Sequence, residues 1–212
     1  MAIKNVKKIK IISVDFQKEF SAECGKHYRK HTNVEFIKNI LIPFLRKNNI
    51  KIAEIISDYR QPRPGDLDGS THPGEEGYIS EIPNDIKLKN IWIKCMNSPI
   101  WTRKNIGNQK KEPGIPYQDT KSFTKWLNST IGKPNEVDQV VLIGLTIDCC
   151  VFCTGQELKW RGYNVLILKE AVDVYSGDPK EKELIFNNPP LLNWMKVISW
   201  NKLKEIMELE ND

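Results

Sequence analysis

Three residues with the chemistry of a hydrolase stand at the ends of separate apolar runs. Asp15, Lys94 and Cys150 each come at, or shortly after, the end of a short stretch rich in Ile, Val and Leu. A carboxylate can move protons, an ammonium group stabilises negative charge, and a cysteine can attack a carbonyl carbon. The three types together predict nucleophilic cleavage of an amide, with a cysteine at the start of a helix as nucleophile.

The position of the adjacent Cys149 and Cys150 strengthens this prediction. They stand in the first turn of a helical stretch expected at 149–161, where a cysteine faces the free N–H groups and the positive end of the helix dipole. We expect this setting, with Lys94 nearby, to favour the thiolate, and the same N–H groups to stabilise an oxyanion. Taken singly, Asp15 could cap a loop, Lys94 could face solvent, and Cys150 could be a small buried apolar residue.

The rest of the chain predicts a parallel α/β fold that would bring these residues together. Apolar runs without polar alternation are typical of strands covered on both faces. We expect strands at 9–14, 50–57, 91–94, 140–145, 165–168 and 197–200. Helical spacing predicts helices at 34–47 (irregular at Pro43), 120–131, 149–161, 178–186 and from 201 onward.

Strands that alternate with helices indicate an open, mainly parallel six-stranded sheet with helices on both faces. In such sheets ligands bind beyond the carboxyl ends of the strands, where the strand order reverses. Segment 59–90 is rich in Pro and Gly and longer than an ordinary connection, so we expect it to be a lid or binding loop, and 98–117 is a second loop-like stretch. No repeat or linker divides the chain, so we expect a single domain over residues 1–212.

Composition argues against several other classes of function. The net charge is +5, but the lysines are spread among acidic residues, whereas a nucleic-acid binder clusters basic residues and favours Arg. The densest basic run, at Lys4, Lys7, Lys8 and Lys10, is interpreted as a solubilising lead-in to the first strand. The longest apolar stretch, 140–147, falls well short of a membrane span. We therefore expect neither nucleic acid nor membrane as partner.

The five cysteines give no pattern of a disulfide framework or zinc site. Cys150 and Cys153 form one C-x-x-C pair, but no second pair and no nearby histidine completes a zinc set, and the start of the chain lacks the apolar core of a signal peptide. We expect free thiols in the cytoplasm.

Several motifs occur in an order that resembles a known family. They are Asp15-Phe16-Gln17, the segment from Lys94 to Ser98, the set Gly144, Asp148, Cys150, Val151 and Thr154, and the downstream Gly162-Tyr163-Asn164-Val165 with Asp173. Over about residues 9–173 the chain resembles the isochorismatase-like cysteine hydrolases, which include nicotinamidases and N-carbamoylsarcosine amidases.

The resemblance implies a Rossmann-like three-layer sandwich and assigns an Asp15, Lys94 and Cys150 triad. It selects Cys150 over its neighbours Cys149 and Cys153 as the nucleophile. It also implies a cis peptide at Leu145–Thr146 that directs the Thr146 N–H, with that of Cys150, to the substrate oxygen. Homo-oligomers are common in the family, so we expect one here.

One departure from the family concerns a metal site. Nicotinamidases hold a divalent metal with a D-x-H pair, and here Asp58-Tyr59-Arg60 carries an arginine, which cannot ligate a metal. Leu67 stands near the place of a second histidine, and His72 is the alternative, displaced ligand. Asp58 would be the one retained ligand. We therefore expect no metal or other cofactor, and consider nicotinamide a less suitable substrate.

These observations predict a hydrolase that cleaves a small amide or ureido C–N bond through a thioester on Cys150. Arg60 is expected to grip a substrate carboxylate. Phe16, Phe20 and Trp101 are candidate pocket walls, with ordinary core packing as the equal alternative. The other functions left open are a nicotinamidase, an isochorismatase-type hydrolase and a non-catalytic binding protein.

Overall fold

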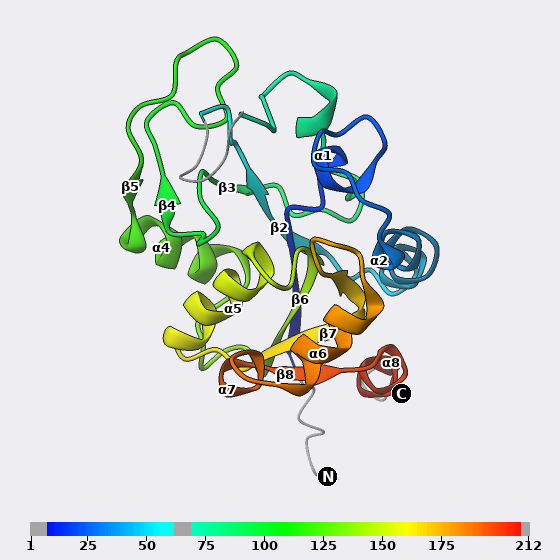
Figure 1. Ribbon diagram of the computed structural model, residues 1–212. Helices are drawn as coiled ribbons and strands as arrows, with labels where there is room; N and C mark the ends of the chain where they lie inside the picture. Colours follow the sequence, from blue (N-terminus) through cyan, green and yellow to red (C-terminus); the bar gives the residue numbers. More distant parts are fainter. Residues whose placement is uncertain (1–7, 62–68, 209–212) are drawn as a thin grey trace.

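The central sheet of the protein contains six strands that all run parallel (Figure 1). A computed structural model describes residues 8–61 and 69–208. The sheet order is β3-β2-β1-β6-β7-β8. The strands are β1 (Ile9–Val14), β2 (Ile52–Ser57), β3 (Trp92–Lys94), β6 (Gln139–Leu145), β7 (Val165–Asp173) and β8 (Lys196–Ile198). The predicted fold class is confirmed, and each predicted strand is present.

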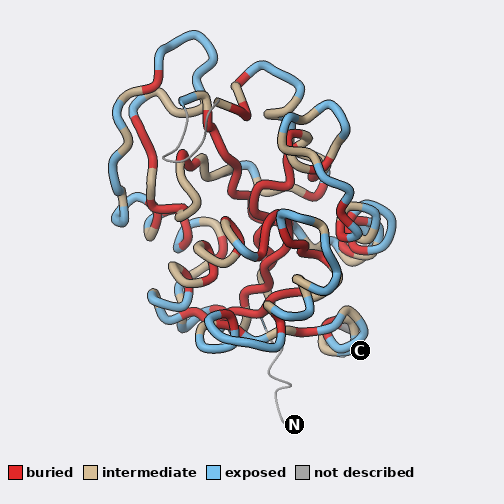
Figure 2. Tube along the Cα trace, viewed as in Figure 1, coloured by how far each residue is buried: buried red, intermediate tan, exposed pale blue. Residues whose placement is uncertain are grey.

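Helices cover both faces of this sheet and give the expected three layers. One face carries α4 (Thr120–Thr130), α5 (Cys150–Trp160), α6 (Pro179–Asn187) and α7 (Leu191–Trp194). The other carries the helical run of α2 (Thr32–Phe36), η1 (Ile37–Leu41) and α3 (Ile42–Lys47), together with α8 (Trp200–Glu208). Neighbouring residues of β1 point to opposite layers, Ile12 toward α4 and α5 and Ile11 toward η1 and α8. Figure 2 shows the central strands as the most buried part of the chain.

The helical run 32–47 contains the irregularity that Pro43 predicts. Its middle segment, η1, is a π-helix, in which the N–H of Ile42 bonds to the carbonyl of Ile37. Proline has no N–H and its ring collides with the carbonyl four residues earlier, so an ordinary α-helix cannot continue through it unchanged. The wider turn before Pro43 accommodates the ring without ending the helix.

Several short elements were not predicted. Segment 98–117, expected to be a loop, contains β4 (Trp101–Thr102), which forms a small antiparallel sheet with β5 (Tyr117–Gln118). α1 (Lys18–Ser21), η2 (Glu76–Tyr78) and α7 were also missed, because elements of two to four residues are too short to show a periodicity. β7 extends five residues beyond the predicted end at 168, since Lys169 and Glu170 interrupt its apolar pattern.

The sheet reverses its order between β1 and β6. From β1 the chain continues to β2 and β3 on one side, then returns to add β6 on the other side of β1. The close approach of β1 and β6 depends on Gly144, which has a φ of 114° and whose added Cβ would lie 2.0 Å from the Val14 carbonyl oxygen. Asp15 and the turn before Cys150 therefore emerge side by side at this point.

Two general predictions concern thiols and membranes. All five cysteines are free. Within residues 8–61 and 69–208, the structure contains no helix with the length and apolar character needed to cross a bilayer. Lys4 and Lys7 of the basic run lie outside the described residues, as does Leu67.

Candidate active site

Asp15 leaves the end of β1 in a left-handed conformation, with φ of 50°, and its side chain is almost completely buried. One carboxylate oxygen accepts a hydrogen bond from the Ser57 hydroxyl at 2.7 Å. The other lies 2.7 Å from the ammonium nitrogen of Lys94. A buried carboxylate needs such partners to remain charged, so Asp15 and Lys94 form an internal ion pair.

Lys94 ends β3, beside Ser57 in the sheet register, and its side chain is fully buried. Burial by itself lowers the pKa of Lys94, but the facing charge of Asp15, with Cys150 and Tyr59, outweighs it and holds the pKa well above the ordinary 10.5. The ammonium group therefore carries its charge throughout the neutral range. Its remaining contacts are with Ser57 Oγ at 2.9 Å, Met96 O at 3.1 Å, Cys150 Sγ at 3.4 Å and the Tyr59 hydroxyl.

Cys150 is the first residue of α5 and is buried, with its sulfur 3.4 Å from the Lys94 ammonium. Hydrogen bonding with the adjacent Cys149 and burial raise the pKa of Cys150 well above its ordinary 9.0, while Lys94 lowers it only in part. The expectation that this setting lowers the pKa of Cys150 is therefore wrong. A raised pKa favours the thiol, which then loses its proton during attack.

Gln17 explains why the Asp-x-Gln spacing matters. Its buried side chain accepts from the Ser57 backbone N–H at 2.8 Å and donates to the Ser57 carbonyl at 3.2 Å. Gln17 thereby holds the end of β2 against the chain that leaves β1. This fixes the Ser57 hydroxyl between the Asp15 carboxylate and the Lys94 ammonium.

The turn between β6 and α5 presents two backbone N–H groups. The peptide bond between Leu145 and Thr146 is cis, as the resemblance implies. In the described part of the chain, the N–H groups of Thr146 and Cys150 have no hydrogen-bond acceptor. Both are therefore available to a ligand oxygen, the role that the sequence assigned to them.

A pocket of about 310 Å³ opens beside the triad. Of the four candidate substrate-binding residues, Phe20 lines this pocket. Phe16 does not: it is fully buried and packs in the core beneath η1. Trp101 packs against the core on the α4 side. The full lining is Asp15, Phe20, His27, Leu145, Thr146, Asp148, Cys149, Cys150 and Tyr175.

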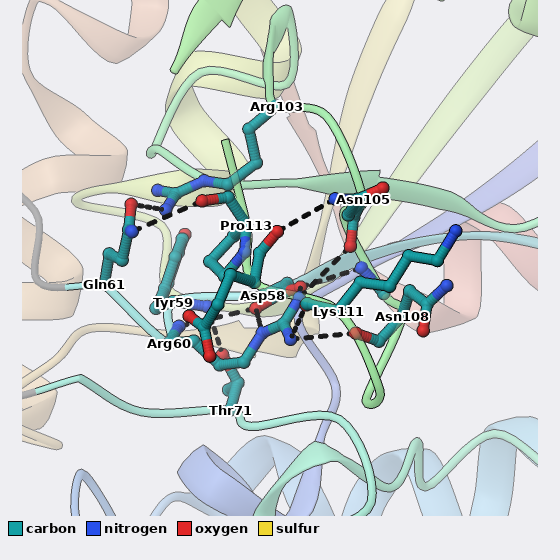
Figure 3. A network of polar contacts seen from close by, with 12 residues as sticks. Asp58, Tyr59, Arg60, Gln61, Thr71, Arg103, Asn105, Asn108, Lys111 and Pro113 are labelled. Atoms are coloured by element: carbon teal, nitrogen blue, oxygen red, sulfur yellow. Dashed lines mark hydrogen bonds and ion pairs between the residues drawn. The ribbon is translucent and has the colours of Figure 1, made fainter. Parts of the chain in front are cut away.

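Arg60 does not line the pocket, because Asp58 and a neighbouring loop hold its guanidinium (Figure 3). Its Nε and one terminal nitrogen donate to the two Asp58 carboxylate oxygens at 2.9 and 2.8 Å. Its other N–H groups donate to the carbonyls of Asn105, Asn108 and Lys111 at 2.9 to 3.2 Å. All five N–H donors of the guanidinium have acceptors, so the expected grip on a substrate carboxylate has no free donor in this arrangement.

The same contacts show whether Asp58 is free to bind a metal ion. Its carboxylate accepts from Arg60 and, at 2.7 Å, from the Gly107 N–H. The guanidinium occupies the side of Asp58 where a cation would bind, so these residues do not fit a divalent metal. Across the ranges that the structure describes, His72 included, no three His, Cys, Asp or Glu side chains come close enough to hold a metal ion.

Other polar residues at the site were not predicted. Ser57, Tyr59 and His27 lie at the triad or its pocket, and His27 is held by Glu19 through an Nδ1 contact of 2.8 Å. The sequence signal for Ser57 and Tyr59 was their place at the end of β2, directly beside Asp58. His27 gave no signal, because it follows α1 in an irregular segment.

The fold and the site together define an open parallel α/β protein with a cysteine at the point of strand-order reversal, beside a buried Asp–Lys pair. No protein-family model matches the chain, and no curated protein matches it significantly.

Solved structures match it over nearly the full length. An isochorismatase-like hydrolase from Alkaliphilus metalliredigens has a TM-score of 0.61 at 17% identity, covering 96% of this chain and 98% of that one. N-carbamoylsarcosine amidase from Thermoplasma acidophilum has 0.57 at 18%, covering 91% and 96%. The pyrazinamidase of Pyrococcus horikoshii in complex with zinc has 0.60 at 17%, covering 91% and 99%. The chain therefore has the isochorismatase-like hydrolase fold.

Proposed function

We propose that the protein is a cysteine hydrolase that cleaves a small amide or ureido C–N bond through a thioester on Cys150. The observation that carries this proposal is the position of the Cys150 sulfur, 3.4 Å from Lys94, which in turn lies 2.7 Å from Asp15. The group opens onto a pocket with two available backbone N–H donors. Its size suits a small molecule, and amidases among the structures of this fold support the same reaction class.

In the first half-reaction, the Cys150 sulfur bonds to the carbonyl carbon and its proton passes to the Asp15 carboxylate. The N–H groups of Thr146 and Cys150 stabilise the oxyanion, and Lys94 stabilises the negative charge as it moves from carboxylate to sulfur. The tetrahedral intermediate collapses when the C–N bond breaks and Asp15 returns the proton to the leaving nitrogen. Ammonia or an amine departs, and an acyl group remains on Cys150.

In the second half-reaction, a water molecule takes the place of the amine. Asp15 removes a proton from this water as its oxygen attacks the thioester carbon, and the same two N–H groups stabilise the oxyanion. The C–S bond then breaks, Asp15 returns the proton to the sulfur, and the carboxylic acid leaves. The cycle restores the thiol and the Asp15–Lys94 ion pair.

The substrate class can be tested with a panel of primary amides, N-carbamoyl amino acids, ureas and nicotinamide. We expect hydrolysis of at least one small amide or ureido compound, loss of turnover in Cys150→Ala, and an acyl adduct on Cys150 by intact mass. Cys24→Ala is the matched control, because Cys24 is an exposed cysteine that does not line the pocket. Undiminished turnover in Cys150→Ala would refute the proposal.

The assembly and location of the protein also belong to this proposal. We propose a cytoplasmic homo-oligomer whose ligand is a small molecule. Light scattering coupled to size exclusion tests the assembly, and a mass equal to one chain would contradict it.

A further inference from the structure

Tyr59 lies at the centre of the candidate active site, although neither the sequence motifs nor the proposed mechanism uses it. Its side chain is almost completely buried, and its hydroxyl is 3.5 Å from the Cys150 sulfur and 3.3 Å from the Met96 carbonyl oxygen. The Lys94 ammonium contacts the same hydroxyl, and lies 4.9 Å from the centre of the tyrosine ring. The tyrosine oxygen, the lysine nitrogen and the sulfur thus all lie within contact distance of one another.

The donors and acceptors around this oxygen fix the direction of the hydrogen bonds. An ammonium group can only donate, so the Tyr59 oxygen accepts from Lys94. The hydroxyl proton is then available to another acceptor, and two acceptors among the described residues lie within reach, the Met96 carbonyl and the Cys150 sulfur. A hydroxyl that accepts from a cation becomes a stronger donor, because hydrogen bonds in a chain polarise one another.

The choice between the two acceptors changes with the charge on sulfur. A neutral thiol is a weak acceptor, and the carbonyl of Met96 then takes the hydroxyl proton. A thiolate is a far stronger acceptor, and rotation about the C–O bond of Tyr59 turns the proton toward it. No covalent bond of Tyr59 breaks, since the thiol proton itself goes to Asp15.

We propose that Tyr59 is a fourth catalytic residue, whose hydroxyl, polarised by Lys94, donates to the Cys150 sulfur when the thiol loses its proton and so stabilises the nucleophile alongside Lys94. The proposal deepens the proposed function and rests on Cys150 being its nucleophile. This contact strengthens as negative charge appears on sulfur, which is what an interaction must do to accelerate attack.

The backbone around Tyr59 holds the hydroxyl in place. Its N–H donates to the Thr71 hydroxyl at 2.9 Å (Figure 3). Its carbonyl accepts from the Ser70 N–H at 2.9 Å. The flanking residues Asp58 and Arg60 form the ion pair described above. A side chain fixed on both sides loses little freedom when it donates to the thiolate.

The test is the rate at which Cys150 reacts with iodoacetamide, followed by peptide mass spectrometry that separates it from Cys149. Tyr59→Phe keeps the ring and removes only the hydroxyl. At a pH below the titration midpoint of Cys150, the alkylation rate follows the fraction of thiolate. Loss of one hydrogen bond to the thiolate should therefore slow alkylation about tenfold. With a substrate from the amide panel, kcat should fall by a similar factor while KM stays nearly constant.

Tyr163→Phe is the matched control, because Tyr163 is equally buried and its hydroxyl donates to the Gly132 carbonyl at 2.7 Å, outside the site. It should leave the alkylation of Cys150 unchanged. A second measurement uses protein in which 3-fluorotyrosine replaces every tyrosine. Its more acidic hydroxyl donates more strongly, so Cys150 should react faster, and this gain should vanish in the Tyr59→Phe background.

The outcomes separate this inference from the proposed function. An alkylation rate in Tyr59→Phe within about twofold of wild type would overturn the role of Tyr59, even if amide turnover is found. A slower alkylation with no amide turned over would support the role of Tyr59 and count against the proposed reaction. Should Tyr59→Phe fail to fold, an unchanged rate in the fluorotyrosine protein would overturn the inference by itself.

Discussion

The guanidinium of Arg60 binds both carboxylate oxygens of Asp58, its neighbour two positions earlier, at 2.8 and 2.9 Å. Asp58 is fully buried, and the side chain of Arg60 is 11% exposed. The pair also fixes the loop 105–111, because Arg60 donates to three of its carbonyls and Asp58 accepts from the Gly107 N–H. The Arg60 guanidinium thus neutralises the Asp58 carboxylate at the end of β2 and holds the loop 105–111 in place.

Removal of Arg60 should therefore destabilise the protein strongly. Arg60→Ala leaves the Asp58 carboxylate buried without its counter-charge, and we expect the free energy of unfolding to fall by about 3 kcal/mol or more. Arg46→Ala is the control: Arg46 also forms a bidentate pair, with Asp85, but both side chains are about half exposed to solvent, so its loss should have a much smaller effect. Urea titration measures both, and equal effects would contradict the structural role of Arg60.

Asp15 should be required for turnover rather than for binding. Asp15→Asn keeps the acceptor for Ser57 but cannot take the Cys150 proton, so we expect kcat to fall by about 10²- to 10⁴-fold. Asp148→Asn is the matched control, since Asp148 lines the same pocket and its carboxylate accepts from the Tyr175 N–H. Steady-state kinetics on the best substrate of the panel compares them. A larger loss in Asp148→Asn than in Asp15→Asn would reverse the assignment.

Gly144 should tolerate no side chain. Its φ of 114° is unfavourable for other residues, and an added Cβ would lie 2.0 Å from the Val14 carbonyl oxygen. We expect Gly144→Ala to separate β1 from β6 and to yield little folded protein. Gly162 has a similar φ of 90°, but its nearest neighbour would lie 3.7 Å away, so Gly162→Ala should cost only about 1 to 2 kcal/mol. Circular dichroism and thermal melting of the two variants distinguish the effect of backbone strain alone, in Gly162→Ala, from that of a steric collision, in Gly144→Ala.

The sequence predicted the parts of the structure that repeat or that are buried on both faces. Strands such as β1 and β6 lie between two layers of helices, so every position is apolar and the run is easily recognised. Asp15, Lys94 and Cys150 could be predicted because each follows or ends such a strand. The carboxyl ends of parallel strands share one edge of the sheet.

What the sequence did not predict depends on contacts between distant segments. The partners of Arg60 lie in the loop 105–111, which no periodicity places beside β2, and a free guanidinium was therefore expected. Phe16 follows Asp15 directly, so it points away from the site into the core. The raised pKa of Cys150 depends first on hydrogen bonding with Cys149 and on burial, which Lys94, paired with Asp15, offsets only in part. No local sequence pattern shows this balance.

The protein should become less stable at alkaline pH, because Cys150 and Lys94 hold their protons more tightly in the folded chain than in the unfolded one. Folding raises the pKa of Cys150 above 9.0 and that of Lys94 above 10.5, so above these values the unfolded chain binds fewer protons than the folded one. The stabilisation is complete below pH 9.0 and is lost as the pH rises toward the folded values. Tyr78 and Tyr163, with pKa values raised to about 12, add to the same fall at higher pH.

Cys150→Ala isolates the contribution of the thiol. Between about pH 9 and pH 10.5 the wild-type free energy of unfolding should fall by up to about 1.4 kcal/mol per pH unit more than that of the variant, which is the effect of one proton. Cys24→Ala should keep the wild-type slope, because the Cys24 side chain is exposed. Urea titrations at a series of pH values measure the slopes. Parallel curves for wild type and Cys150→Ala would mean that Cys150 does not rest as a buried thiol.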